Sequence, residues 1–312
     1  MTEPAADPSR GGRPPLAGIL LVLLLALIWG VNWPAIRAAV TEMSPWTFRA
    51  ICLAAGTVTL FSLSAVRRAR LAVPRSERWP LIGVGLLNVT AWHMFSAYGL
   101  TMIEAGRGVI LGFTFPLRSV LLGAIVLRER ITAGRALALL LGFAAMAPLL
   151  GGEIGEVGRS PLGALLLIGS AMCWAGATIL MKSRDWSIGS GELAAWQLAI
   201  GAGPIFIGML LIDTVPDFSR VSLQGWVGLI YSSAIAVAFG QWIWFRILRI
   251  MPSAVASIST LAIPVVGVFS SGLLLGEPIG WRELSALALV LVALFLVLVG
   301  REGLRALARL LR

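Results

Sequence analysis

The sequence predicts an all-helical protein that crosses a membrane ten times. Hydrophobic residues make up 58% of its 312 residues, charged residues make up 13%, and the mean hydropathy is +0.90. Ordinary soluble domains carry about a quarter charged residues. Apolar runs long enough to cross the hydrocarbon core as helices, about 20 residues each, follow one another along the chain. The short connections between these runs leave no room for a soluble domain.

The elements follow in order from the amino terminus. Residues 1–15 are polar and rich in proline, so we expect a disordered cytoplasmic tail. The next apolar run exceeds signal-peptide length and lacks a convincing cleavage site, so we interpret it as the first span. Residues 301–312 form a basic amphipathic segment, expected to lie on the inner leaflet. The predicted spans are 16–36, 46–66, 80–102, 105–127, 132–151, 161–182, 192–212, 223–246, 253–276 and 281–300.

The basic residues predict how the spans are oriented. With the amino terminus inside, five of the 25 lysines and arginines fall on the outer side, two lie within spans, and the other 18 fall on the inner side. This excess follows the positive-inside rule, so both termini are expected in the cytoplasm. The net charge of +10 is therefore interpreted as a topology signal and not as a nucleic-acid-binding surface. The five outer residues are Arg37, Arg107, Arg159, Arg220 and Arg282.

The fourth predicted span has a counterpart in the ninth. Pro116 is followed thirteen residues later by Glu129, and Pro264 is followed thirteen residues later by Glu277. The offset between the two pairs is 148 residues. Other counterparts are Phe48-Arg49 with Trp196-Gln197 and, at an offset of 145, Trp29 with Trp174 and Arg37 with Lys182.

This duplication predicts two repeats, residues 16–151 and residues 161–300. Each repeat holds five spans, which is an odd number, so the second repeat must be inverted relative to the first. Inverted repeats are typical of secondary transporters, which bind their substrates near the midplane between the repeats.

These motifs resemble those of the drug/metabolite transporter superfamily, in its EamA-type branch of ten-helix proteins. The resemblance covers residues 16–300. It implies a fold of two inverted five-helix repeats and the export or exchange of small metabolites, often amino acids or related compounds. It also implies a central cavity lined mainly by helices 1, 3, 4, 6, 8 and 9. The matching residues are Trp29-Gly30-x-Asn32-Trp33, Cys173-Trp174-Ala175, Phe48-Arg49, Pro116 with Glu129, and Pro264 with Glu277.

Arg118 is the first candidate for substrate binding, and Thr114 beside it is another. Arg118 lies inside the fourth span, one turn from Thr114, and its counterpart in the second repeat is Val266. An arginine in an apolar span is costly and usually faces a bundle interior or a wet cavity. There it can pair with a substrate carboxylate or phosphate. The alternative is that its side chain extends to the inner headgroups.

Aromatic and amide side chains share faces of several other predicted helices. Such faces suit an amphipathic cavity in which a few polar groups orient a small molecule. The alternatives are an interfacial belt for the indoles and close helix packing for the small hydroxyl residues. The candidates are Trp29, Asn32 and Trp33 on helix 1, Asn88, Trp92 and His93 on helix 3, Trp174 on helix 6, Gln241 on helix 8, and Ser257 and Thr260 on helix 9. Pro116 and Pro264 are the predicted hinge positions.

Four polar residues are expected to be mainly structural. His93, the one histidine, can shuttle protons near neutral pH, but a neutral interhelical hydrogen bond is the favoured interpretation. Arg49 lies near the outer end of helix 2, where it is expected to bond neighbouring helix ends or lipid phosphates. Glu129 and Glu277 precede a span, and each carboxylate is expected to favour the positive N-terminus of the helix that follows it.

The sequence therefore predicts a secondary transporter of the inner membrane, not an enzyme. It is expected to export or exchange an amino acid or a related anionic or zwitterionic metabolite by alternating access. The alternatives are an importer or carrier of a sugar-linked metabolite, a non-transporting membrane scaffold and an intramembrane enzyme, for which nucleophile, base and metal ligands cannot be assembled. Cys52 and Cys173 are expected to be free thiols. The expected partners are a small-molecule substrate and the bilayer, with no nucleic acid, metal or cofactor, and a homodimer stays open.

Overall fold

The computed structural model describes residues 16–128, 133–145, 147, 161–213, 217–240, 242–244, 247 and 262–298. All regular structure within these residues is helical, and it occupies parts of each predicted span. The predicted tails, 1–15 and 301–312, lie outside the described residues. The elements are α1 (Leu16–Val40), α2 (Pro45–Val66), α3 (Arg75–Gly85), η1 (Leu86–Ala91), α4 (Trp92–Met102), α5 (Ala105–Gly112), α6 (Phe115–Val126), α7 (Ala133–Ala144), α9 (Pro161–Lys182), α10 (Ser190–Leu211), η2 (Phe218–Arg220), α11 (Leu223–Ile230), η3 (Tyr231–Phe239), α14 (Ala262–Leu275) and α15 (Trp281–Leu298).

Several of the described helical segments have the length and surface of membrane spans. Large apolar side chains point away from the bundle, and Leu223 and Leu273 are more than 80% exposed. Lipid tails tolerate such surfaces, because water is absent from the hydrocarbon core. The prediction of a multi-pass membrane protein is thus confirmed, whereas the number of ten spans stays a prediction. Six spans among the described residues are long and apolar enough to cross a membrane: Leu20–Val40, Pro45–Val66, Ala105–Val126, Pro161–Lys182, Ser190–Leu211 and Leu223–Trp244.

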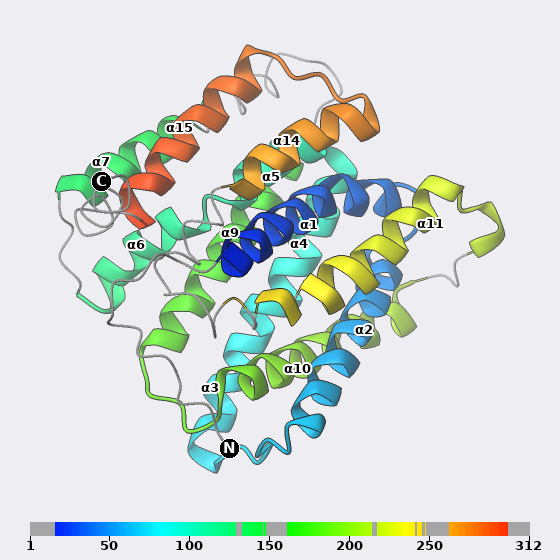
Figure 1. Ribbon diagram of the computed structural model, residues 1–312, viewed down its shortest axis with the longest axis vertical. Helices are drawn as coiled ribbons and strands as arrows, with labels where there is room; N and C mark the ends of the chain where they lie inside the picture. Colours follow the sequence, from blue (N-terminus) through cyan, green and yellow to red (C-terminus); the bar gives the residue numbers. More distant parts are fainter. Residues whose placement is uncertain are drawn as a thin grey trace.

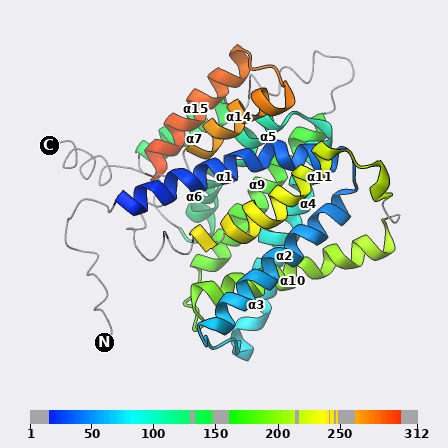
Figure 2. The same cartoon turned by 45° about the vertical axis from the view of Figure 1, so that its right-hand side comes forward.

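The helices form a bundle whose two edges are helix pairs (Figures 1 and 2). The pair of α7 and α15 lies at one edge, the pair of α2 and α10 lies at the opposite edge, and α1, α4, α9 and α14 lie between them. Within the central group, α1 packs against α14 and α11, while α9 packs against α6 and α4. Helices that are far apart in the sequence therefore form the centre of the bundle.

The fourth predicted span breaks into α5 and α6 at Phe113 and Thr114. The ring of a proline clashes with the carbonyl four residues earlier in a helix. For Pro116 that carbonyl belongs to Gly112, the last residue of α5. The break thus follows from the proline that the sequence marks as a hinge. Pro264 is the third residue of α14, and the residues just before this helix lie outside the described part of the chain.

The partner of Glu277 differs from the expected one. Its two carboxylate oxygens accept hydrogen bonds from the backbone N–H groups of Ala105 and Gly106, at 2.8 and 2.9 Å. Glu277 therefore caps α5 and not the following helix, α15, where Glu283 accepts from the N–H of Gly280 instead. The chain can turn back toward α5 because Gly276, just after α14, has a φ of +66°. Glu129 lies outside the described residues.

Glycine allows α10 to approach α3 and η1 closely. A Cβ atom added at Gly201 would lie 2.3 Å from the Cβ of Val89 and 2.6 Å from the carbonyl oxygen of Gly85. A Cβ atom added at Gly203 would meet nothing within 4 Å. Small residues are the usual means of close helix packing in membranes. The two glycines therefore differ in role although they lie in one helix.

This difference predicts opposite effects of one substitution. Gly201→Ala is expected to destabilise the protein by about 1–3 kcal/mol, because the backbone of α3 cannot yield to the added carbon. Gly203→Ala is expected to leave stability unchanged or to raise it by up to about 1 kcal/mol through helix propensity. Melting temperatures of the two variants in detergent test this. Equal melting temperatures would contradict the packing described here.

Candidate functional site

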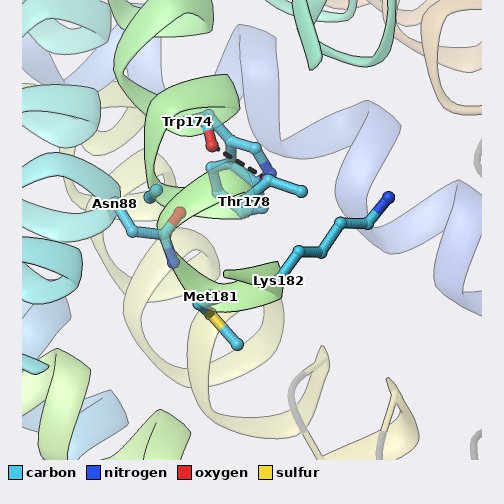
Figure 3. A pocket seen from close by; sticks show the side chains of 6 residues that line it. Asn88, Trp174, Thr178, Met181 and Lys182 are labelled. Carbon is cyan, nitrogen blue, oxygen red and sulfur yellow. Dashed lines mark hydrogen bonds between the residues drawn. The ribbon is translucent and has the colours of Figure 1, made fainter. Parts of the chain in front are cut away.

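A cavity of about 330 Å³ lies between Asn88 and one face of α9. Trp174, Thr178, Met181 and Lys182 follow one another at helical spacing, so they share this face. Figure 3 shows Asn88 directed from its own helix toward α9. The residues that line the cavity are Asn88, Trp174, Ala177, Thr178, Met181 and Lys182.

A π-helical segment positions Asn88. The segment η1 interrupts the long helix that runs from α3 to α4, and π-turns of this kind are frequent at functional sites. The side-chain nitrogen of Asn88 donates to the side-chain oxygen of Gln197, at 3.0 Å. Gln197 in turn donates to the sulfur of Met181, at 3.4 Å. This chain of bonds orients the amide of Asn88 and leaves its carbonyl oxygen as a hydrogen-bond acceptor.

Thr178 offers a second acceptor. Its hydroxyl donates to the carbonyl oxygen of Trp174, at 2.9 Å, as the dashed line in Figure 3 marks. Because that bond uses the hydroxyl proton, the lone pairs of the oxygen are available to a donor in the cavity. Lys182, one turn further along α9, is exposed and brings a positive charge to the edge of the cavity. The cavity thus combines two neutral acceptors with one cation.

An aromatic cluster joins the cavity to helices α4 and α6. The ring centroids of Trp92 and Trp174 lie 4.7 Å apart, and those of Phe115 and Trp174 lie 5.3 Å apart. Aromatic pairs at such distances stabilise a packed arrangement beyond the area they bury. The structure therefore brings together Asn88 and Trp92, which the sequence analysis placed on helix 3, and Trp174, which it placed on helix 6.

The predicted residues of helix 1 lie in a different place. The indole N–H of Trp29 donates to the carbonyl oxygen of Ala236 in η3, at 3.1 Å. Trp33 is buried, and a Cβ atom at Gly112 would lie 2.4 Å from its ring. The side-chain oxygen of Asn32 is buried and has no hydrogen-bond partner among the described residues. None of these three side chains lines the cavity.

Arg118 and Thr114 lie between α6 and α7. The guanidinium of Arg118 donates to the hydroxyl of Thr114, which donates to the carbonyl oxygen of Leu111. Arg118 is 4% exposed, and the space beside it, bordered also by Gly142 and Phe143, is too narrow for a water molecule. The surroundings of Arg118 and the lining of the cavity share no residue. Substrate binding by Arg118 stays a prediction.

His93 and Arg49 lie next to each other. The guanidinium of Arg49 donates to the backbone carbonyl of His93, at 3.1 Å, and to the hydroxyl of Ser96, at 3.0 Å. This arrangement joins α2 to α4, in line with the structural role expected for Arg49. The Nδ1 atom of His93 is buried without a hydrogen-bond partner among the described residues. Gln241, Ser257 and Thr260 lie outside those residues.

Four residues of the site were missed in the sequence: Thr178, Met181, Lys182 and Gln197. Three of them continue the helical spacing that begins at Trp174, and this spacing is the signal that could have found them. Gln197 is the repeat counterpart of Arg49. This correspondence marked the position of Gln197 but not its role. Cys52 and Cys173 are free thiols, as predicted.

Comparison with known proteins identifies the family. Residues 16–150 and residues 161–299 each match the EamA-like transporter family. The uncharacterized transporter YvbV of Bacillus subtilis (strain 168) is 28% identical over 285 residues, which cover 89% of this chain and 90% of that protein. The probable amino-acid metabolite efflux pump of Escherichia coli (strain K12) is 24% identical over 290 residues, which cover 90% of this chain and 94% of that protein.

The fold is also found among solved structures. One of them, described as "Crystal structure of protein", aligns with a TM-score of 0.62 at 19% identity and covers 92% of this chain and 97% of that chain. This likeness concerns the fold alone. Because the family match extends over nearly all of both halves, the chain belongs to the EamA-like transporter family.

Proposed function

We propose that this transporter exports or exchanges a small zwitterionic metabolite of the amino-acid type by alternating access, and that the cavity beside α9 binds it. The observation that carries the proposal is the set of groups around the cavity, which has a cation at its edge, two neutral acceptors further in and apolar walls. These groups complement a molecule that carries a carboxylate, an ammonium group and an apolar side chain.

Each part of such a molecule has a matching group. The ammonium of Lys182 can pair with the carboxylate by a charge-assisted hydrogen bond. The carbonyl oxygen of Asn88 and the hydroxyl oxygen of Thr178 can accept from the substrate ammonium. The indole face of Trp174 favours a nearby cation as well as apolar carbon. Met181 adds an adaptable apolar surface for side chains of different shape.

Size supports a small substrate over a large one. Ligand pockets have volumes of about 300–1,000 Å³, and the cavity, at about 330 Å³, lies at the lower end of that range. A sugar-linked carrier molecule would need more room. The relatives in Escherichia coli and Salmonella typhimurium that are named probable amino-acid metabolite efflux pumps support both the substrate class and the outward direction.

In the proposed topology, the protein crosses the inner membrane ten times and has both termini in the cytoplasm. The ten spans form two inverted repeats, residues 16–151 and 161–300. The contacts support the repeats. Exchanging α1 with α9, α3 with α11, and α6 with α14 converts the contacts of α1 with α14 and α11 into those of α9 with α6 and α3. The edge pairs, α2 with α10 and α7 with α15, map onto themselves. The charge bias of the loops supports the orientation.

The first test concerns Lys182. Lys182→Met is expected to raise the Kd for an amino acid with an uncharged side chain about 2–10-fold, since one hydrogen bond or ion pair contributes about 0.5–1.5 kcal/mol. Lys182→Arg keeps the charge and is expected to bind as the parent does. Binding is measured on purified protein by the rise in melting temperature across amino acids, amino-acid amides and organic acids. Amides that bind as tightly as the free acids would contradict carboxylate recognition at Lys182.

The second test concerns Arg118. Arg118→Gln is expected to lower the melting temperature of the free protein, because the variant loses a buried charge-assisted bond worth about 1–3 kcal/mol. The increase in melting temperature that an amino acid causes is expected to equal that of the parent. If Arg118→Gln instead abolished the increase while Lys182→Met retained it, the anionic group would bind at Arg118.

A further inference from the structure

An ion-pair cluster lies at the end of the bundle opposite the mouth of the cavity. Arg37, near the C-terminal end of α1, pairs with Glu277 at 3.2 Å between Nε and Oε1. Lys182, its repeat counterpart, is at the C-terminal end of α9, where the cavity lies. In inverted repeats these two ends face opposite sides of the membrane. On the proposed topology, the cavity thus lies toward one side of the membrane and the Arg37–Glu277 pair toward the other.

Between them, α1, α5 and α14 pack without a gap. A Cβ atom at Gly30 would lie 2.5 Å from Val266, and a Cβ atom at Gly267 would lie 2.8 Å from Val109. Val109 is fully buried. One turn further along α5, the ring of Trp33 covers Gly112. These close contacts indicate that, among the described residues, the seam of α1, α5 and α14 is closed on the Arg37 side.

The ion pair links every element of the seam. The guanidinium of Arg37 also donates to the carbonyl oxygens of Leu100 and Ile103, which end α4. The carboxylate of Glu277 follows α14 and caps the first two N–H groups of α5. One contact therefore holds α1, α4, α5 and α14 together.

The contact is also suited to opening. Burial raises the pKa of Glu277 above its ordinary value, because the bonds from Gly106 and Ala105 and the charge of Arg37 only partly offset the loss of water. Glu104 adds a repulsive charge nearby. The ionised carboxylate thus loses more by burial than its partners return. When the seam opens, water can replace these partners at the membrane surface.

We propose that Arg37 and Glu277 form the latch of the extracytoplasmic gate. These two side chains must separate before the bound molecule can leave on that side. This inference rests on the proposed function, since only a transporter needs the seam to open. The neighbouring pair of Arg107 and Glu283, at 2.8 Å, joins α5 to α15. It therefore links α5 to a helix beside the seam.

Cysteine labelling tests the latch without reference to any substrate. The reporter is Val109→Cys in a background in which Cys52 and Cys173 are replaced by alanine. Glu277→Gln and Arg37→Ala are each expected to raise its maleimide labelling rate in detergent about tenfold, which corresponds to about 1.4 kcal/mol removed from the closed state. Asp217→Asn, which breaks the exposed pair of Asp217 and Arg220, is the matched control and is expected to change nothing.

A purely structural carboxylate gives a different result. Glu277→Gln would then lower the melting temperature while the labelling rate of Val109→Cys stayed at the parent value, and this would overturn the latch. The labelling result is independent of the cargo: a parent protein that moves no amino acid refutes the proposed function but leaves the labelling result in place.

A second variant serves if the single substitutions do not fold. Arg37→Cys and Glu277→Cys are combined in the same background and joined by a cleavable thiol cross-linker. The cross-linked protein in liposomes is expected to lose transport and to regain it after reduction. Undiminished transport while the cross-link is intact would show that the two residues need not separate, which overturns the proposal.

Discussion

Helix ends that are buried inside a bundle have no water to bond to, and this constraint explains why charged residues gather where α4 gives way to α5. The last carbonyls of one helix and the first N–H groups of the next have no partners within their own helices. Arg37 donates to the carbonyls, Glu277 accepts from the N–H groups, and the two side chains neutralise each other. A single ion pair thus satisfies both helix ends, and it comes from two segments that are 240 residues apart in the sequence. The packing of α1 and α14 depends on it.

The features that the sequence predicts well are local ones. Span positions follow from the length of apolar runs, and the break after Gly112 follows from Pro116. The partner of Glu277 could not be predicted, because a carboxylate between two helices can turn toward either, and the left-handed turn at Gly276 decides the direction. The direction in which the side chain of Arg118 points could also not be predicted from the sequence. Helical spacing identifies the face of a side chain but not which neighbouring helix that face meets.

The candidate site shows the same limit. Asn88 and Trp92 were predicted from one helical face and Trp174 from a repeat motif, and long-range packing brings them together. Lys182 was interpreted as a topology signal because it ends a span. A residue at a span end can set the topology and also line a binding cavity. The two halves of the fold also differ in side chains. Trp29 reaches the carbonyl of Ala236 because its neighbour is Gly240, while Trp174 meets Trp92 at the corresponding place. Among the described residues, the contact between Trp92 and Trp174 beside the cavity thus has no equivalent at Trp29.

The two π-helical segments lie at equivalent places in the two halves, since Leu86–Ala91 falls within Tyr231–Phe239 when shifted by 148 residues. A π-turn closes its hydrogen bond over five residues in place of four, so it is the form a helix takes when one extra residue is inserted. It is unnecessary to assume that two independent insertions occurred at matching positions. Because residues 16–150 and 161–299 match the same family, a single insertion that preceded duplication of this unit would account for both. The irregularity beside Asn88 is then older than the chain that now carries it.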